Sequence, residues 1–514
     1  MRRLVRLTYL IILLGGLATV LAQTTTGTFG GTVSDATGGR VAQAAVTALN
    51  VETGQKLKAE TTGTGDFIIV QVPPGKYEVD VVAKGFKSLS RKGLTLDVDG
   101  KITLDLVLEV GSITESVSVT GEAPLLRTQD AQMGEVVNSL MVENLPQIDR
   151  DPLNMLRLTG DISGTATSAN PAGSPGSDVR INGGRMQGMD VLVDGNSVDS
   201  GKYHAIYAGG TPTMEQVDEF KVVTNGIPAE YGRVSGGLVT MVTRGGTNEI
   251  HGRGFEFFKN QLFDANTWEA NNETPYVAGQ KAPRTGFHQN DYGGTIGGPV
   301  VLPKIYNGKN KTFFFFNFEG LKQRQAGNPV LAMSASANDR NGNLTGLQTF
   351  GSGPEMYDPL GDTTVDPSTG YLLKATLFPG NGQIIPAARI NPLAQLIDNY
   401  QPMPNNPSAP GNTQQDAWLG FQSSAINDNR WEVRMDHNIT DNQRLTMRFF
   451  RDNYNQGSSD YYSVISPGNH QIRPGALTGS LGWVWTATPT TIVEVRGSVM
   501  HNPNTSHYNF PAGE

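Results

Sequence analysis

The sequence has 514 residues, of which 37% are hydrophobic and only 17% are charged, and it contains 62 glycines and no cysteine. This length predicts about two to four folding units. A glycine-rich composition favours many short strands over a helical bundle. The net charge of −8 provides no basic surface for nucleic acid, and the lack of cysteine excludes disulfides and thiolate sites.

The N-terminus has the features of an export signal. Arg2, Arg3 and Arg6 precede an apolar run over residues 7–21, which ends at Ala22. This order is typical of a secretory signal peptide, and we expect residues 1–22 to be removed by cleavage after Ala22. A retained membrane anchor is the alternative, but the run is shorter than the ~20 residues of a spanning helix.

Short β-prone segments separated by glycine turns fill residues 24–110. We expect strands at residues 28–34, 45–50, 56–61, 66–72, 75–83 and 102–108. The motifs GTVSD (31–35), GDF (65–67), PGKY (74–77) and KGF (84–86) resemble the carboxypeptidase-regulatory-like family. That resemblance implies a prealbumin-like β-sandwich without a catalytic group.

A short β-prone run follows within a linker at residues 111–129. It consists of Glu115, Ser116, Val117, Ser118, Val119 and Thr120. One interpretation is a last edge strand of the sandwich. The other is a docking strand that a partner pairs with through main-chain hydrogen bonds. The local sequence favours neither interpretation over the other.

Residues 130–245 mix two patterns. Helical spacing occurs at 136–140 and 152–158, and strands are expected at 220–224 and 238–243. The motifs NGGR, VLVDG, VDEFKVV, PAEYG and GG before VTMVT resemble the plug domain of TonB-dependent outer-membrane receptors of the Oar-like branch. The residues that carry the resemblance are Arg185, Asp194, Gly195, Glu219, Glu230, Tyr231, Gly232, Gly236 and Gly237.

Two residue types in this region suggest how a plug would fit inside a wall. Gly195, Gly232, Gly236 and Gly237 predict backbone angles or close contacts that a side chain forbids, although ordinary turns also use glycine. Four arginines are candidates for ion pairs with a surrounding wall, with a solvated surface as the alternative. They are Arg180, Arg185, Arg233 and Arg244.

After residue 246 the strand-like runs alternate between apolar and charged residues. They cover residues 252–259, 287–296, 312–318, 431–437, 444–451, 476–486 and 491–500, and several approach the ~10 residues of a tilted membrane strand. Residues 430–451 have the pattern of a hairpin. A membrane barrel explains the alternation with lipid outside and a wet lumen inside. The charges expected to face the lumen are Glu432, Arg434, Asp436, Arg444, Arg448, Glu494 and Arg496.

The segments HGRGFEFFKN, DYGGTIGGPV and KTFFFFNFEG resemble the first barrel strands of Oar-like receptors. The chain is therefore expected to be mainly β, with a sandwich, an α/β plug and, in residues 246–514, the first part of a large antiparallel transmembrane β-barrel. The resemblance implies about 22 strands in the complete wall. We expect an N-terminal portion of a longer receptor, with extracellular loops at 266–284 and over most of 323–428.

No catalytic pattern is present. The seven histidines form no His-Glu-x-x-His motif, and neither a Gly-x-Ser-x-Gly elbow nor a phosphate loop occurs. Asp35, Asp66 and Asp194 are acidic residues at turns, where turn formation explains them better than calcium binding. We expect no enzyme activity, cofactor or metal.

The resemblance implies a TonB-dependent receptor in the outer membrane of a Gram-negative-type bacterium, surrounded by outer-membrane lipid. It would take up a scarce, unidentified extracellular ligand, and residues 115–120 would pair with a TonB-type energy transducer; no nucleic acid is expected as a partner. A non-transporting surface protein, such as an adhesin or scaffold with a plugged barrel, is the main alternative. A soluble secreted β protein is the third possibility.

Overall fold

The computed structural model describes most of the chain after the first residues. The described residues are 25–112, 116–120, 132–144, 150–164, 179–186, 188–200, 205–206, 210–229, 231–232, 234–266, 268–272, 284, 286–345, 356–361, 364–370, 372–399, 401–405, 417–458, 470–488 and 491–508. The signal-peptide prediction for residues 1–22 lies outside them. No helix within these ranges has both the length and the apolar character needed to cross a bilayer.

The N-terminal unit is a β-sandwich of two sheets, ordered β4-β1-β7 and β3-β2-β5-β6-β8. Its side chains alternate between core and solvent, and Phe29 of one sheet packs edge-on against Tyr77 of the other, with ring centroids 5.4 Å apart. The predicted sandwich is confirmed. The strands are β1 (Gly27–Asp35), β2 (Ala45–Asn50), β3 (Lys56–Glu60), β4 (Asp66–Val72), β5 (Gly75–Val82), β6 (Ser88–Leu96), β7 (Lys101–Leu108) and β8 (Ser116–Thr120).

Strand β6 was absent from the sequence prediction. Its residues SLSRKGLTL include two cations and Gly93, a composition that weakens a strand pattern. The ladder with β5 forms nevertheless, and β6 also pairs in parallel with β8, from Ser88 opposite Ser116 to Lys92 opposite Thr120. β8 therefore lies at the edge of the five-stranded sheet.

The plug is built on a five-stranded sheet in the order β13-β12-β17-β16-β9. Residues 136–137 are strand rather than helix, because they pair with Phe220 and Lys221 of β16. The 3₁₀ helix η1 (Pro152–Leu158) replaces the expected α-helix, and Asp151 caps it. The main elements are β9 (Met133–Val137), α2 (Ser139–Asn144), β12 (Met189–Val193), β13 (Asn196–Ser197), β16 (Val217–Asn225) and β17 (Gly237–Thr243), with short pairs β10 (Ile162–Ser163) with β11 (Arg180–Ile181) and β14 (Asp199–Ser200) with β15 (Ala205–Ile206).

The C-terminal half forms one antiparallel sheet, which we call the wall, in the order β18-β19-β22-β25-β26-β27-β28, with β29 beside β27. The predicted hairpin at residues 430–451 is confirmed by the β25–β26 ladder. Among the described residues β18 and β28 end the sheet without pairing with each other. The strands are β18 (His251–Asn260), β19 (Phe287–Pro299), β22 (Thr312–Met333), β25 (Ala417–Thr440), β26 (Gln443–Ser458), β27 (His470–Thr488), β28 (Thr491–His501) and β29 (Asn504–Tyr508).

Two wall strands are much longer than predicted. β22 and β25 pair from Thr312 opposite His437 as far as Met333 opposite Ala417, so residues 323–333 and 417–428 are strand and not loop. Their continuation is possible because backbone pairing between neighbours does not require an apolar face. Between them lie α4 (Ala337–Arg340), β23 (Thr364–Val365), β24 (Leu372–Lys374), α5 (Pro379–Gly382), η4 (Ala387–Arg389) and α6 (Pro392–Asn399). The other segments outside the main sheets are η3 (Gln261–Phe263), α3 (Trp268–Asn272), β20 (Val301–Leu302) and β21 (Tyr306–Asn307).

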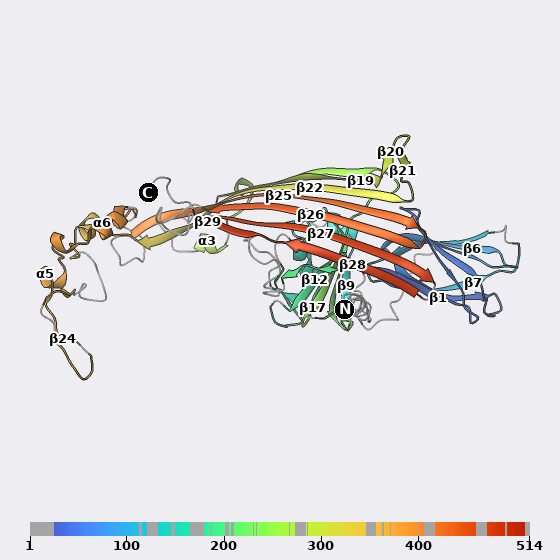
Figure 1. Cartoon of the computed structure of the whole chain (residues 1–514), viewed down its shortest axis with the longest axis horizontal. Coiled ribbons are helices and arrows are strands. Elements are labelled where there is room, and N and C mark those ends of the chain that lie inside the picture. The colour runs from blue at the N-terminus through green and yellow to red at the C-terminus, as the bar shows by residue number, and fades with distance from the viewer. Residues whose placement is uncertain are drawn as a thin grey trace, which may run out of the picture.

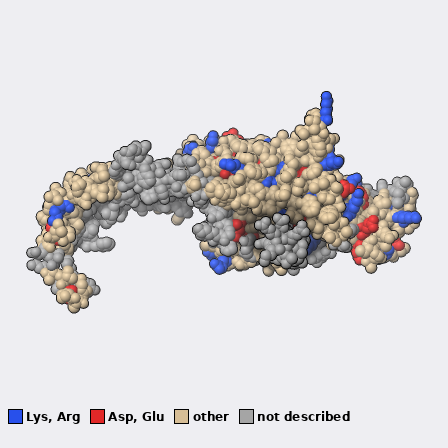
Figure 2. Space-filling model, in the orientation of Figure 1, with Lys and Arg blue, Asp and Glu red and all other residues tan. Residues whose placement is uncertain are grey.

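The two faces of the wall have opposite character. Apolar side chains such as Phe449 and Leu481 are exposed on the outer face, whereas Glu432 and Arg448, one residue out of phase, are buried on the inner face. The outer surface of the wall is mostly uncharged, while charged residues are more frequent over the sandwich (Figure 2). A soluble sheet would bury the apolar face, so this inversion favours lipid outside.

The three units are stacked along the molecule (Figure 1). The wall arches over the plug sheet, and the sandwich lies at the end where β25 and β26 join by a short turn. The segments around α5 and α6 extend from the opposite end. The concave side of the wall and the plug therefore face each other directly.

Candidate functional site: the charged contact between plug and wall

Asp194 is a plug residue that contacts arginines on the inner face of the wall. It occupies the turn between β12 and β13, where Asp194 and Gly195 both have positive φ, 49° and 81°. Its carboxylate accepts hydrogen bonds from the backbone N–H and the hydroxyl of Thr243, at 3.0 and 2.8 Å. The turn and β17 together fix the carboxylate at the edge of the plug sheet.

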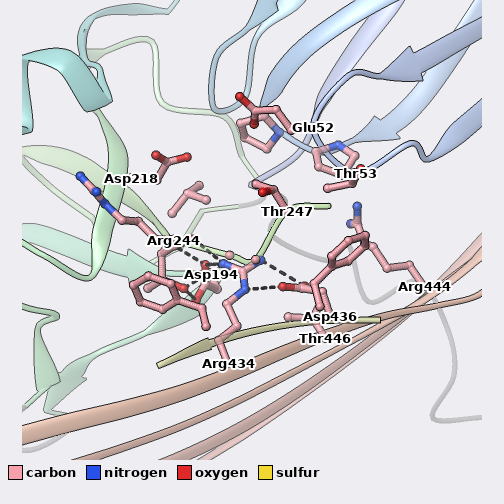
Figure 3. A pocket seen from close by; sticks show the side chains of 18 of the residues that line it. Glu52, Thr53, Asp194, Asp218, Arg244, Thr247, Arg434, Asp436, Arg444 and Thr446 are labelled. Atoms are coloured by element: carbon pink, nitrogen blue, oxygen red, sulfur yellow. Dashed lines mark hydrogen bonds and ion pairs between the residues drawn. The ribbon is translucent and has the colours of Figure 1, made fainter. Parts of the chain in front are cut away.

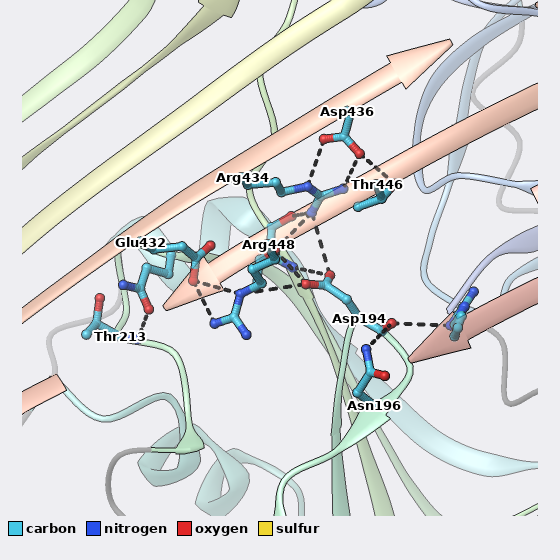
Figure 4. Close-up of polar contacts among 11 residues, drawn as sticks. Asp194, Asn196, Thr213, Glu432, Arg434, Asp436, Thr446 and Arg448 are labelled. Carbon is cyan, nitrogen blue, oxygen red and sulfur yellow. Dashed lines mark hydrogen bonds and ion pairs between the residues drawn. The ribbon is translucent and has the colours of Figure 1, made fainter. Parts of the chain in front are cut away.

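Arg434 of β25 reaches this turn from the wall (Figure 4). Its Nη1 lies 3.6 Å from the Asp194 carboxylate and donates to the hydroxyl of Thr243 at 2.9 Å. Its Nε and Nη2 donate to the two oxygens of Asp436 at 2.8 and 3.2 Å. The bidentate pair with Asp436 holds the guanidinium plane in the orientation that contacts the plug.

Two more wall arginines converge on Asp194. Arg448 of β26 lies 3.9 Å from its carboxylate and is held by Glu432, with 2.6 Å between Arg448 Nη2 and Glu432 Oε2. Arg496 of β28 donates to the backbone carbonyl of Asp194 at 3.2 Å and pairs with Glu494. Three wall strands, β25, β26 and β28, thus contact one turn of the plug.

Asp194 adds a negative charge to a contact that is rich in arginine. The seven lumen-facing residues predicted from the sequence comprise four arginines and three carboxylates. Because an uncompensated charge inside protein is costly, the pairing of Asp194 with Arg434 and Arg448 favours having the plug beside the wall.

A cavity of about 830 Å³ adjoins the contact where the sandwich, plug and wall meet (Figure 3). Arg444 projects into it from the wall, and the sandwich contributes Glu52 and Thr53. On the sandwich side, burial raises the pKa of Tyr77 to about 12, and its hydroxyl donates to the carbonyl of Pro73 at 2.8 Å.

A second group of charges was not predicted from the sequence. Arg150 of the plug pairs with Glu215 at 2.7 Å and with Asp291 of β19 at 2.9 Å. On β25, Arg430 pairs with Asp428 at 2.7 Å. Asp428 and Arg430 share the face of Glu432, so extending the period-two pattern of β25 by four residues would have found them. No local pattern marks Arg150, because it precedes η1 in an irregular segment.

The remaining plug residues singled out in the sequence have different surroundings. The Glu219 carboxylate accepts a hydrogen bond from the backbone N–H of Val98 in the sandwich. Tyr231 is buried against Leu192 and Leu238. Arg185 is exposed, Arg244 donates to the carbonyl of Val217 at 3.0 Å, and Glu230 and Arg233 lie outside the described residues. Arg150, which was not among the four candidate arginines, pairs with a wall carboxylate, Asp291 of β19.

The glycine prediction holds at some positions and fails at another. Gly195 has a left-handed backbone, and a Cβ on Gly237 would lie 2.3 Å from Ile181, so both positions exclude larger residues. A Cβ on Gly236 would make only an ordinary contact, 3.4 Å from Gly188 O. Gly232 has open space where a side chain would be, and the prediction is wrong there.

Asp35, an acidic turn residue of the sandwich, stabilises its turn through hydrogen bonds. The Asp35 carboxylate accepts from the hydroxyl and N–H of Thr37 and from the N–H of Gly39, at 2.6, 2.8 and 2.8 Å. The hydrogen bond from the Thr37 hydroxyl contributes most to holding the pKa of Asp35 below its ordinary value. No group of three or more metal-binding side chains occurs among the residues that the structure describes.

The family of outer membrane β-barrel domains matches residues 242–513, more than half of the chain. The chain belongs to this family. The carboxypeptidase regulatory-like domain family matches residues 28–109, which include the sandwich strands β1 to β7. The chain is also similar to the TonB-dependent transporter Oar of Myxococcus xanthus, with 27% identity over 320 residues that cover 62% of this chain and 29% of that protein. It thus spans less than a third of that relative.

Among solved structures, the outer membrane transporter YddB from Escherichia coli aligns over 73% of this chain and 40% of its own, with 10% identity and a TM-score of 0.41. The 3-chlorocatechol 1,2-dioxygenase of Rhodococcus opacus 1CP aligns over 18% of this chain and 62% of its own, with 12% identity and a TM-score of 0.15. Neither score is high enough to bear on the fold or the activity.

Membership in the outer membrane β-barrel family indicates that the wall lies in the outer membrane. The exposed apolar face belongs in lipid, and the inner face belongs in a lumen that the plug occupies. The Asp194 contact is therefore a contact between a barrel and its contents. It is made of ion pairs and hydrogen bonds rather than of apolar packing.

Proposed function

We propose that this chain is part of a TonB-dependent outer-membrane receptor, which takes up an unidentified scarce substrate with energy from the inner membrane. The observation that carries the proposal is a folded plug on the concave side of a lipid-facing wall, held there by the charged contact around Asp194. Similarity to a TonB-dependent transporter supports the same function.

The proposed units follow the boundaries expected from the sequence. They are an export signal at 1–22, the sandwich at 24–110, a linker at 111–129, the plug at 130–245 and the wall from residue 246. The short turns and the sandwich share one end of the wall, which we assign to the periplasm of a Gram-negative-type cell. The long segments at the other end would meet the extracellular ligand.

The proposed docking site for the transducer is the run Glu115 to Thr120, of which Glu115 lies outside the described residues. Its backbone forms strand β8, which supports recognition by strand pairing. Such recognition depends on main-chain N–H groups and tolerates changes of side chain. A substitution that removes an N–H is therefore the most direct perturbation.

Binding of the transducer's purified periplasmic domain to the full-length receptor tests this proposal. Val117→Pro removes one backbone donor and should abolish binding, whereas Val117→Thr keeps the backbone and a β-branched side chain and should bind like the original chain. Equal binding of the proline variant would contradict the docking assignment.

A non-transporting surface protein with a plugged barrel is the competing function. The two functions differ in their need for energy. Cells with and without the transducer should differ in accumulation of ligand if the chain is a transporter and should not differ if it is an adhesin or scaffold.

A further inference from the structure

The proposed docking strand is not free in the structure. Residues 116–120 pair in parallel with residues 88–92 of β6, so β8 is a strand of the sandwich sheet. Only one of its two backbone edges has a neighbour among the described strands, because β8 ends the order β3-β2-β5-β6-β8. The strand proposed to receive the pull is thus stored in a folded domain.

The sandwich is also fixed to the wall. Gln71 donates to Glu494 of β28 at 2.9 Å, and the backbone N–H of Asn248 donates to the carbonyl of Glu52 at 2.9 Å. Lys58 pairs with Asp441 in the β25–β26 turn at 3.3 Å. The wall is a sheet held in the membrane and does not follow a pull on a single strand.

The same domain is clamped to the plug. The turn after β6 offers the N–H of Val98 to Glu219 and the carboxylate of Asp99 to Lys221, the latter at 2.9 Å. Both acceptor and donor on the plug belong to β16, an interior strand of the plug sheet. The sandwich therefore bridges the plug and the wall.

This arrangement determines which contacts transmit a force applied to β8. While β8 is paired with β6, force enters the sandwich and is shared between its contacts to the wall and its clamp on β16. The covalent path to the plug runs from residue 120 to β9, the edge strand of the plug sheet, and it carries load only after β8 leaves β6. The β6–β8 ladder has five residue pairs, as many as the ladder that joins β9 to β16.

We propose that the pairing of β8 with β6 is a latch: the docking strand is stored in the sandwich and must leave β6 before a pull along the chain reaches β9, the edge strand of the plug. This inference rests on the proposed function, since it takes β8 as the strand that the transducer binds. It assigns the sandwich a regulatory role, because anything that strengthens the β6–β8 ladder delays opening.

A reversible crosslink can hold the latch closed. The chain has no cysteine, so the pair Ser90→Cys and Ser118→Cys forms only the intended disulfide. These residues are Cα partners in the β6–β8 ladder, and neighbouring strands lie about 4.8 Å apart, within the roughly 4.4–6.8 Å that a disulfide spans. Thr47→Cys with Asp80→Cys, which joins β2 to β5 in the same sheet, is the matched control because it leaves β8 free.

The test pulls on full-length receptor in a supported bilayer with the transducer's periplasmic domain on a force probe. We expect reduced protein and the oxidised β2–β5 control to show chain extension as the plug unfolds, and the oxidised β6–β8 variant to lose it. Equal extension with the β6–β8 disulfide intact would overturn the latch. Failure of the probe to attach to the reduced protein is a different result, which removes the docking assignment and the latch with it.

Discussion

At the scale of single residues, the central feature is the ion pairing between Asp194 and arginines of the wall. Period-two alternation predicted seven inner-face charges on β25, β26 and β28, because side-chain direction in a strand follows from position alone. Asp428 and Arg430, on the same face of β25, were not among them. The same reasoning could not say which plug residue the predicted charges meet. That partner is fixed by a left-handed turn that brings Asp194 to the wall.

Asp194→Asn should loosen the plug in the wall. The substitution keeps an acceptor for Thr243 but removes the negative charge, which leaves the wall arginines uncompensated. Losing one partner of a buried ionic group costs about 3 kcal/mol. Chemical denaturation of full-length receptor, monitored by hydrogen exchange in β17, measures the loss of stability.

Two controls separate charge from packing in this prediction. Asp441→Asn breaks the exposed Lys58 pair and should cost less than about 1 kcal/mol. Asp194→Asn combined with Arg444→Gln keeps the original net charge and should recover part of the stability. A double variant no more stable than Asp194→Asn alone would exclude charge balance as the cause.

The burial of Tyr77 predicts that the sandwich loses stability at alkaline pH. Burial raises its pKa to about 12 from an ordinary value of 10.0, so the folded sandwich holds the phenolic proton more tightly than the unfolded chain. The stabilisation is complete below pH 10 and is lost as the pH rises through about 12, a change of about 3 kcal/mol. Ultraviolet titration of tyrosinate should lose a component near pH 12 in Tyr77→Phe. A titration unchanged by this substitution would contradict the assignment.

At the scale of elements, adjacent residues of a wall strand should respond oppositely to the same change. Leu481 of β27 is 51% exposed on the outer face, whereas Ser480, its neighbour in the strand, points to the opposite face and is the ladder partner of Arg448. Leu481→Glu should destabilise the wall by about 2 kcal/mol in a bilayer, and Ser480→Glu, which places a carboxylate beside Arg448, should have little effect. Equilibrium unfolding of full-length receptor in lipid vesicles measures both, and a larger effect at Ser480 would reverse the assigned faces.

The elements that sequence patterns predicted well are those with a uniform environment on each face. β7 alternates throughout, and the β25–β26 hairpin alternates around a polar turn. β6 and the outer parts of β22 and β25 were missed, since pairing to a neighbour formed them despite weak local patterns. Residues 136–137 have helical spacing, yet the open edge of β16 draws them into the plug sheet.

At the scale of the whole molecule, the sandwich should depend on Lys221 for its position on the plug. Lys221 is buried and its partner Asp99 is partly exposed, so Lys221→Met removes the ion pair while leaving Asp99 able to reach water. We expect faster hydrogen exchange at the amide of Val98, which is covered by the same contact. Lys58→Met, at the exposed pair with Asp441, is the matched control and should leave exchange at Val98 unchanged.

The rate of hydrogen exchange at Val98 in the two variants shows whether the plug or the wall holds the sandwich in place. If exchange at Val98 rises equally in both variants, the sandwich is held mainly by the wall. If neither variant changes it, the clamp on β16 does not hold the sandwich. The latch requires that the sandwich stay attached at both contacts while β8 is paired.

The sequence alone determined the order of the units, the β-rich class and the inner and outer faces of the wall, because these follow from local composition and a two-residue period. Only the tertiary structure decided that Asp194 pairs with arginines of the wall, that Arg150 and Lys221 form the other ionic contacts, and that β8 is paired with β6. Each of these joins residues far apart in the chain, and such contacts depend on how folded surfaces meet rather than on any local pattern.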